Sequence, residues 1–185
     1  QDALGADTLG KASVAIGRAA LAVQNFTTAT NAYNTAVGNS AGAAVTTGTE
    51  NTLLGGLAGA ALTTSIRSVL LGYQAGDALT EGSENIAVGK SALSADTLGS
   101  RATAIGKSAL SSQNFTTATN GYNVALGYEA GKAVTTGVEN ILIGGLAGLS
   151  LTDADYNVAI GVTALFTDTL GSKSTAIGQE TLRTQ

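Results

Sequence analysis

The chain lacks cysteine, histidine, methionine, tryptophan and proline altogether in its 185 residues. Without cysteine and histidine it cannot build a structural zinc site, a thiol nucleophile, an imidazole base or a Ser-His-Asp triad. Carboxylates, hydroxyls and nine Lys or Arg side chains are the groups that remain for chemistry. We therefore expect no metal site, no cofactor and no enzymatic activity.

Positive charge and long apolar runs are also scarce. The formal net charge is −4 and is spread along the chain, so we expect neither nucleic acid nor an anionic membrane as a partner. Gly, Thr or Asn interrupts every apolar run within a few residues, which excludes a membrane-spanning segment in this sequence. The chain begins and ends inside a repeat unit, and this indicates an excerpt of a longer fibre.

An aliphatic residue followed by glycine recurs along the whole chain. We call the glycines of these pairs the anchor glycines and predict that they are structural turn residues. They are Gly17, Gly38, Gly55, Gly72, Gly89, Gly106, Gly127, Gly144, Gly161 and Gly178. Successive anchors lie 17 residues apart except for two spacings of 21. A shift of 89 residues superimposes two copies of QNFTTATN, at 24–31 and 113–120. The sequence thus predicts a single repeat domain over 1–185, made of two duplicated five-coil blocks at about 1–89 and 90–178.

The residues before each anchor have the pattern of a strand. The residue one before the anchor is always Ile, Val or Leu, and the residue three before is Val, Ile or Thr. β-branched residues at period two favour extended structure, and we expect their shared face to line a core. The residue between them is Ala or Leu, so the second face is apolar as well. We expect that second face to pack against sister chains, or against the opposite wall of its own coil.

A unit of 17 residues with two short extended segments and two turns is one coil of a parallel β-solenoid, with coils about 4.8 Å apart. The absence of proline fits continuous parallel ladders, because proline would remove a hydrogen-bond donor from each strand. Helical repeats need about 33 residues or more. The predicted fold is therefore all-β, a solenoid of about ten coils of 17 to 21 residues.

The strand motifs resemble those of a known family. Ser13-Val-Ala-Ile-Gly17 and Ser174-Thr-Ala-Ile-Gly178 are similar to the head repeats of YadA-type trimeric autotransporter adhesins. Asn34-Thr-Ala-Val-Gly38 with Thr46-Thr-Gly48 resembles repeats of phage tail-fibre proteins. The resemblance implies a left-handed parallel β-roll of three chains side by side, displayed on a virion or a bacterial surface. The 17-residue period of this chain is longer than that of the usual adhesin head coil.

Two further columns of the repeat predict contacts between coils. The residue five before the anchor alternates acid and base in four successive coils, and we expect a salt-bridge ladder of Glu50, Arg67, Glu84 and Arg101. The residue four before the anchor is Asn in six coils. We expect these Asn side chains to occupy one corner and to bond the stacked neighbour or the backbone.

The two 21-residue units carry four extra residues within or beside QNFTTATN. A regular coil absorbs them by bulging, which brings Phe26 close to Tyr33 and Phe115 close to Tyr122. These four aromatic residues are the candidate receptor contacts, because aromatic rings offer a large rigid contact area. The alternative is that Phe26 and Phe115 fold inward and plug the widened coil.

The function that the sequence favours is a structural or adhesive segment of a trimeric extracellular fibre that supports attachment to a host surface. Its expected partners are two further copies of the same chain and a host glycan or protein. Two alternatives stay open. Regular Thr ranks are typical of an ice-binding solenoid, and carboxylates such as Asp7, Asp96 and Asp168 leave room for a solenoid enzyme that acts on polysaccharides.

Overall fold

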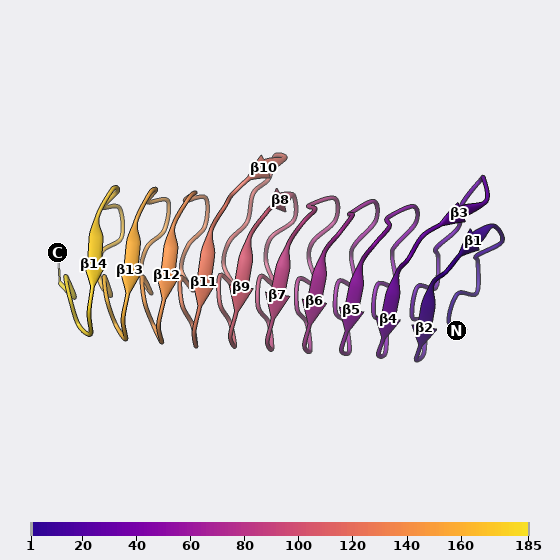
Figure 1. Ribbon diagram of the computed structural model, residues 1–185, viewed down its shortest axis with the longest axis horizontal. Coiled ribbons are helices and arrows are strands. Elements are labelled where there is room, and N and C mark those ends of the chain that lie inside the picture. Colours follow the sequence, from indigo (N-terminus) through magenta and orange to yellow (C-terminus); the bar gives the residue numbers. More distant parts are fainter. Residues whose placement is uncertain (1, 185) are drawn as a thin grey trace.

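The computed structural model describes residues 2–184 and consists of stacked coils in a single row (Figure 1). Every regular element in this range is a β-strand. The two ends of the chain lie at opposite ends of the row (Figure 1). The prediction of an all-β parallel solenoid of about ten coils is confirmed.

One ten-stranded parallel sheet runs the length of the molecule, and each coil contributes one strand of three residues. In chain order the strands are β2 (Val14–Ile16), β4 (Thr35–Val37), β5 (Thr52–Leu54), β6 (Val69–Leu71), β7 (Ile86–Val88), β9 (Thr103–Ile105), β11 (Val124–Leu126), β12 (Ile141–Ile143), β13 (Val158–Ile160) and β14 (Thr175–Ile177). The pairing keeps a constant register, as in Leu71 opposite Val88 and Val88 opposite Ile105. Residues at the same distance from an anchor glycine therefore form one column along the solenoid.

The longer coils carry two additional small sheets. Strand β3 (Thr30–Asn31) pairs with β1 (Gly10–Lys11), and β10 (Thr119–Asn120) pairs with β8 (Gly99–Ser100). Both β3 and β10 belong to the duplicated QNFTTATN segments. In Figure 1, β10 reaches beyond the row of neighbouring loops, so the extra residues protrude as expected.

The inward face of the large sheet is not the one that we predicted. The middle residue of each strand points into the coil, and Ala36, for example, is 0% exposed. The flanking residues point outward, so that Ile16 is 60% exposed. The prediction that the residues one and three before the anchor line the core is wrong. The coil is narrow, and a double row of β-branched side chains would overfill it, whereas a single Ala or Leu per coil fits.

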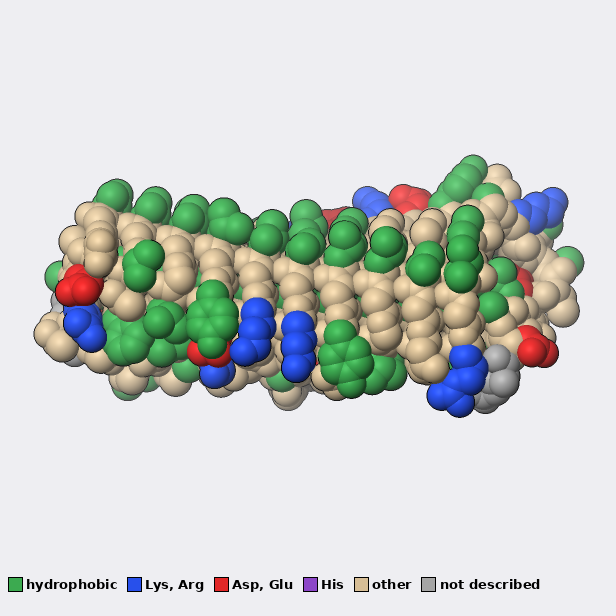
Figure 2. All heavy atoms as spheres, turned by 90° about the horizontal axis from the view of Figure 1, so that it is seen from below, with side chains coloured by type: hydrophobic (Ala, Val, Ile, Leu, Met, Phe, Trp, Pro, Cys, Tyr) green, Lys and Arg blue, Asp and Glu red, His purple; other side chains and the backbone are tan. Residues whose placement is uncertain are grey.

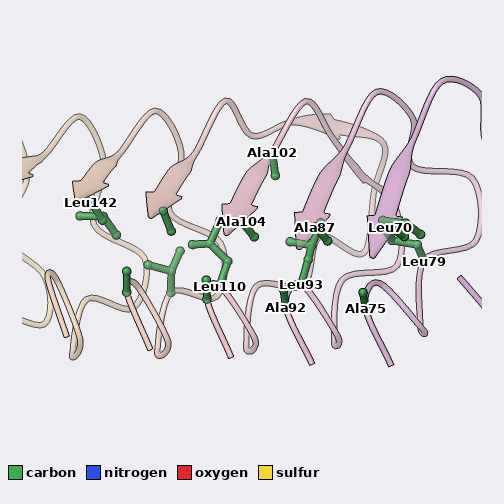
Figure 3. Close-up of a cluster of buried hydrophobic side chains, with 14 of the residues drawn as sticks. Leu70, Ala75, Leu79, Ala87, Ala92, Leu93, Ala102, Ala104, Leu110 and Leu142 are labelled. Atoms are coloured by element: carbon green, nitrogen blue, oxygen red, sulfur yellow. The ribbon is translucent and has the colours of Figure 1, made fainter. Parts of the chain in front are cut away.

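The opposite wall of the coil completes the core. Figure 3 shows Leu70, Ala87 and Ala104 pointing from the sheet toward Leu79, Leu93 and Leu110 on that wall. An Ala three residues after the anchor is buried beside them in nine coils, at Ala20, Ala41, Ala58, Ala75, Ala92, Ala109, Ala130, Ala147 and Ala164.

The opposite wall fills its space in two alternative ways. Some coils have Leu four residues after the anchor and Asp or Gln seven after it, as in Leu110 and Gln113. The others have Gly at the first position and Leu or Val at the second, as in Gly131 and Val134. A Cβ on Gly131 would lie 2.6 Å from a methyl carbon of Leu142. One leucine or valine side chain per coil is thus supplied from one position or the other, which keeps the packed volume nearly constant.

The anchor glycines occupy a turn that only glycine fits. Their φ angles lie between 121° and 144°. At Gly127 a Cβ would lie 2.4 Å from the carbonyl oxygen of Gly144, the anchor of the next coil. The close stacking of turn on turn therefore requires the missing side chain.

Candidate functional site

The buried asparagine column forms a ladder of hydrogen bonds between coils, as the sequence predicted. The backbone N–H of Asn51 donates to the Asn34 side-chain oxygen at 2.9 Å, and the Asn51 amide donates to the Ser65 carbonyl at 2.8 Å. The backbone N–H of Ser68 continues the ladder by donating to Asn51 Oδ1 at 3.0 Å. These polar groups are 0% exposed, so each bond removes a desolvation cost that would otherwise destabilise the coil.

Each Asn ladder begins at an Asp–Gln pair that the sequence analysis did not find, and the pair of the second block is fully buried. Gln113 donates from Nε2 to Asp96 Oδ2 at 2.6 Å and accepts from the Asn123 amide at 2.8 Å. Asp96 Oδ1 accepts the backbone N–H groups of Gly99 and Phe115 at 3.0 and 3.1 Å. Burial raises the pKa of Asp96, although these hydrogen bonds act in the opposite direction.

Asp7 and Gln24 repeat the same arrangement at the start of the first block, with 2.6 Å between Gln24 Nε2 and Asp7 Oδ2. Asp7 and Asp96 lie five coils apart, about 24 Å at the usual strand spacing. Glycosidases hold their two carboxyl groups about 5 to 9.5 Å apart. These carboxylates therefore serve turns and core hydrogen bonds and do not form a catalytic pair.

The charged column is paired at one end only. Glu84 contacts Arg67 at 3.3 Å and Arg101 at 2.9 Å. Arg101 also donates to the Tyr122 hydroxyl at 2.9 Å, with its guanidinium 5.7 Å from the ring centroid. Glu50 stands in the same column without an ion pair among residues 2–184. The ladder thus joins Arg67, Glu84 and Arg101. It does not include Glu50 at one end, and Tyr122 extends it at the other end.

This geometry predicts a titration. The hydrogen bond from Arg101 holds the pKa of Glu84 below its ordinary value, with smaller contributions from the charges of Arg101 and Arg67. We expect Arg101→Gln to move the Glu84 midpoint upward, measured by carboxyl-carbon NMR. Because the folded pKa is depressed, the ladder stabilises the fold above the ordinary pKa and loses its effect as pH falls through the lowered value.

Lys173→Gln is the control for this titration, because Lys173 stands in the same column and makes no ion pair in the described range. It should leave the Glu84 midpoint in place. An unchanged midpoint in Arg101→Gln would contradict the ladder.

The aromatic residues of the long coils divide into two kinds. Phe115 is 5% exposed and Phe26 is similarly buried, whereas Tyr122 is 48% exposed and Tyr33 more so. The prediction that the phenylalanines contact a receptor is therefore corrected. The widened coil leaves space beneath the bulge, and the Phe115 ring fills it against Gly99 and Gly121, where a Cβ would lie 2.7 and 2.9 Å from ring carbons. Tyr33 and Tyr122 remain available on the surface.

A mild truncation tests the packing of this ring. We expect Phe115→Leu to lower the free energy of unfolding by about 1 to 2 kcal/mol, because the smaller side chain leaves part of the space empty. Thermal unfolding followed by circular dichroism measures the change. Thr117→Ala in the same bulge is the control and should unfold like the wild type, since the Thr117 side chain is exposed. Equal melting of both variants would mean that the ring does not support the bulge.

No cleft or pocket, and no cluster of carboxylates able to hold a metal ion, is present in the described residues. The same range contains no helix of the length and hydrophobicity needed to cross a bilayer. Searches of protein families, of curated proteins and of solved structures find no match to this chain. In the described residues, the outer surface of the solenoid is therefore what is available to a partner.

Proposed function

We propose that the chain is a structural and adhesive segment of a trimeric extracellular fibre, of the kind carried by a phage tail or a bacterial surface. The observation that supports this most is the outer sheet face, which we define as the side chains one and three residues before each anchor glycine. Sixteen of these twenty side chains are Val, Ile or Leu. The other four are Thr35, Thr52, Thr103 and Thr175.

The outer sheet face contains an unbroken apolar column, formed by the side chains one residue before the anchors, beside a second column of Val, Ile and four Thr. It follows ten strands, which corresponds to roughly 43 Å at the usual spacing of parallel strands. Figure 2 shows apolar side chains in a row from one end of the molecule to the other. Monomeric soluble proteins seldom leave so long an apolar stripe in water, and such stripes mark protein interfaces.

A second and third copy of the chain are the partners that fit this face best. The face repeats the same residue types in every coil, so another copy offers a surface of equal length and chemistry. Closed rotational symmetry buries the faces of all copies at once. Assembly would give a stiff rod with three equivalent outer surfaces, which suits the multivalent attachment expected of a fibre.

The threonine column of Thr46, Thr63 and Thr80 favours a fibre over an ice-binding surface. The hydroxyls of Thr46, Thr63 and Thr80 each donate to the backbone carbonyl of the threonine in the next coil, at 3.2, 3.2 and 3.0 Å. Their protons are therefore engaged within the solenoid and are not offered to an ice lattice. The lack of a pocket in the described residues likewise gives no support to an enzyme.

Light scattering on the purified protein tests the proposal. The wild type should have three times the 18.1 kDa mass of the chain. The double variant Val88→Glu, Ile105→Glu places two charges at the middle of the outer sheet face and should dissociate the assembly while the β-sheet circular dichroism persists. The control Thr47→Glu, Thr136→Glu changes exposed positions elsewhere on the coil and should keep the wild-type mass. A wild type that is monomeric at all concentrations would contradict the proposal.

A further inference from the structure

A second surface column combines aromatic and basic residues. The residues directly after four successive anchors are Tyr73, Lys90, Lys107 and Tyr128, and we call them the Tyr–Lys row. Backbone hydrogen bonds fix the row: Ser91 N–H donates to Tyr73 O at 3.0 Å, and Ser108 N–H donates to Lys90 O at 3.0 Å. Neighbouring members therefore lie about 4.8 Å apart, and the two tyrosines about 14 Å apart.

All four side chains of the row are exposed. The positions that bound the row are Gly56 and Gly145, which carry no side chain. A Cβ on Gly145 would meet nothing within 4 Å, so the space beside Tyr128 is open. Figure 2 shows two neighbouring basic side chains between apolar ones on this face, the order that the coil register gives for the row. The row is thus a flat, accessible strip with its backbone held in place.

The two lysines differ from the other cations near them in forming no direct ion pair in the described residues. Arg67 and Arg101 are paired with Glu84, and Lys132 contacts Glu129 at 3.2 Å. Neither Lys90 nor Lys107 forms an ion pair within residues 2–184. Lys107 Nζ instead lies 5.2 Å from the centre of the Tyr128 ring. In a chain of net charge −4, the row carries two cations without a direct ion pair; the charge of Lys107 acts on Glu129, which is itself paired with Lys132.

We propose that the Tyr–Lys row binds an anionic polysaccharide. Tyrosine rings pack against the apolar faces of sugar rings, and lysine ammonium groups bind acidic substituents of the intervening sugars. A flat strip covers too little of a small molecule to hold it, whereas a polymer can contact several coils and several copies of the chain together. The proposal rests on the surface-attachment function proposed above and names the class of molecule that is attached.

Nucleic acid fits the row less well. Two cations neutralise little of a polyphosphate, and the net negative charge of the chain repels it. A polysaccharide carries fewer charges along its length and offers the sugar faces on which the tyrosines can stack. The chemistry that the row recognises is therefore an acidic group on a pyranose, and the nature of the acid remains for the experiment to distinguish.

Affinity electrophoresis of the assembled protein tests the inference. The gels contain polygalacturonate for carboxylates, dextran sulfate for sulfates, or neutral dextran as the uncharged control. We expect retardation by at least one anionic polymer and none by neutral dextran. Two double variants should each weaken binding about tenfold: Lys90→Gln with Lys107→Gln, and Tyr73→Ala with Tyr128→Ala. The effect of the lysine variant should be greatest at low salt. The matched control is the double variant Arg67→Gln with Arg101→Gln, which also removes two cations. These cations pair with Glu84 outside the row, so the control should bind the polymer as the wild type does.

Three results would overturn the inference: no retardation of the wild type by either anionic polymer, equal weakening by the arginine control, or equally tight binding of single-stranded oligothymidine. Light scattering on the same samples separates the two proposals. A row variant of unchanged mass that has lost binding supports the inference. A wild-type monomer that still binds the polymer contradicts the trimeric fibre and leaves the row in place.

Discussion

Replacing Gly127 with alanine is expected to lower the free energy of unfolding by about 5 kcal/mol or more, enough to prevent the full stack of coils from forming. The φ angle of Gly127 is 144°, in a region that L-residues avoid. The new Cβ would also lie 2.4 Å from the Gly144 carbonyl oxygen. That carbonyl cannot retreat easily, because the Gly144 N–H is bonded to Leu126 O at 2.8 Å in the sheet ladder.

Two glycine controls separate the clash from the backbone strain. Gly145→Ala adds a Cβ that meets nothing within 4 Å and should change stability by less than about 0.5 kcal/mol. Gly178→Ala has a comparable φ of 122°, but its Cβ would meet only a methyl group of Thr181 at 3.2 Å. It should therefore lower the free energy of unfolding by about 1 to 3 kcal/mol, mainly from backbone strain, because the Thr181 methyl group belongs to a side chain that can shift. Urea unfolding at one protein concentration measures all three, and a Gly127→Ala protein as stable as the wild type would contradict the stacked-turn account.

The architecture was predictable because the repeat is visible along the whole sequence. The anchor glycines give the coil length, and the three residues before each anchor give the strand. The inward face was not predictable from this pattern. Period two defines two faces without saying which is inside, and hydrophobicity alone favours the Ile and Val side chains over Ala. The width of the coil determines which face lies inside. The sequence signal of that tight interior is the exchange between two positions of the opposite wall, Leu110 with Gln113 in one coil and Gly131 with Val134 in the next.

The surface features were predictable only in part. The register correctly placed Arg67, Glu84 and Arg101 in one column. It could not predict that Glu50 makes no ion pair in the described residues, because exposed ion pairs depend on the side-chain rotamers and gain little energy. The length of the inserted segment indicated a bulge and did not reveal the direction of Phe115. The small residues Gly99 and Gly121, between which the ring packs, are the signal that could have predicted it.

The Asp–Gln pairs were readable in the sequence and were missed. Asp7 and Asp96 are each followed by glutamine 17 residues later, which is one coil along the stack. Asp168 has Gln185 at the same spacing, and Gln185 lies outside the described residues. The carboxylates were correctly expected to form turns, as Gly99 N–H to Asp96 Oδ1 at 3.0 Å shows. The second partner of each carboxylate, the glutamine, can be predicted only when the position seven residues after the anchor is known to lie inside the coil.

Replacing Gln113 with leucine is expected to lower the free energy of unfolding by about 3 kcal/mol. The change keeps the size of the side chain and removes both of its hydrogen bonds, to Asp96 at 2.6 Å and from Asn123 at 2.8 Å. All three side chains are 0% exposed, so water cannot replace the lost partners. The same substitution at the exposed Gln179 is the control and should leave urea unfolding unchanged.

The cost of Gln113→Leu should depend on pH, because the group left without its partner is a carboxyl. Burial places the pKa of Asp96 above its ordinary value, so its contribution to stability is fully present below the ordinary pKa and is lost as pH rises through the folded value. Losing the Gln113 donor raises that pKa further, since the donor favours the ionised form. The stability difference between wild type and Gln113→Leu should therefore be larger at about pH 7 than at about pH 3, where the loss of the hydrogen bond from Asn123 remains. In proteins that also carry Asp96→Asn, the stability difference caused by Gln113→Leu should no longer vary with pH. An unaltered pH dependence in these proteins would mean that a group other than Asp96 causes it.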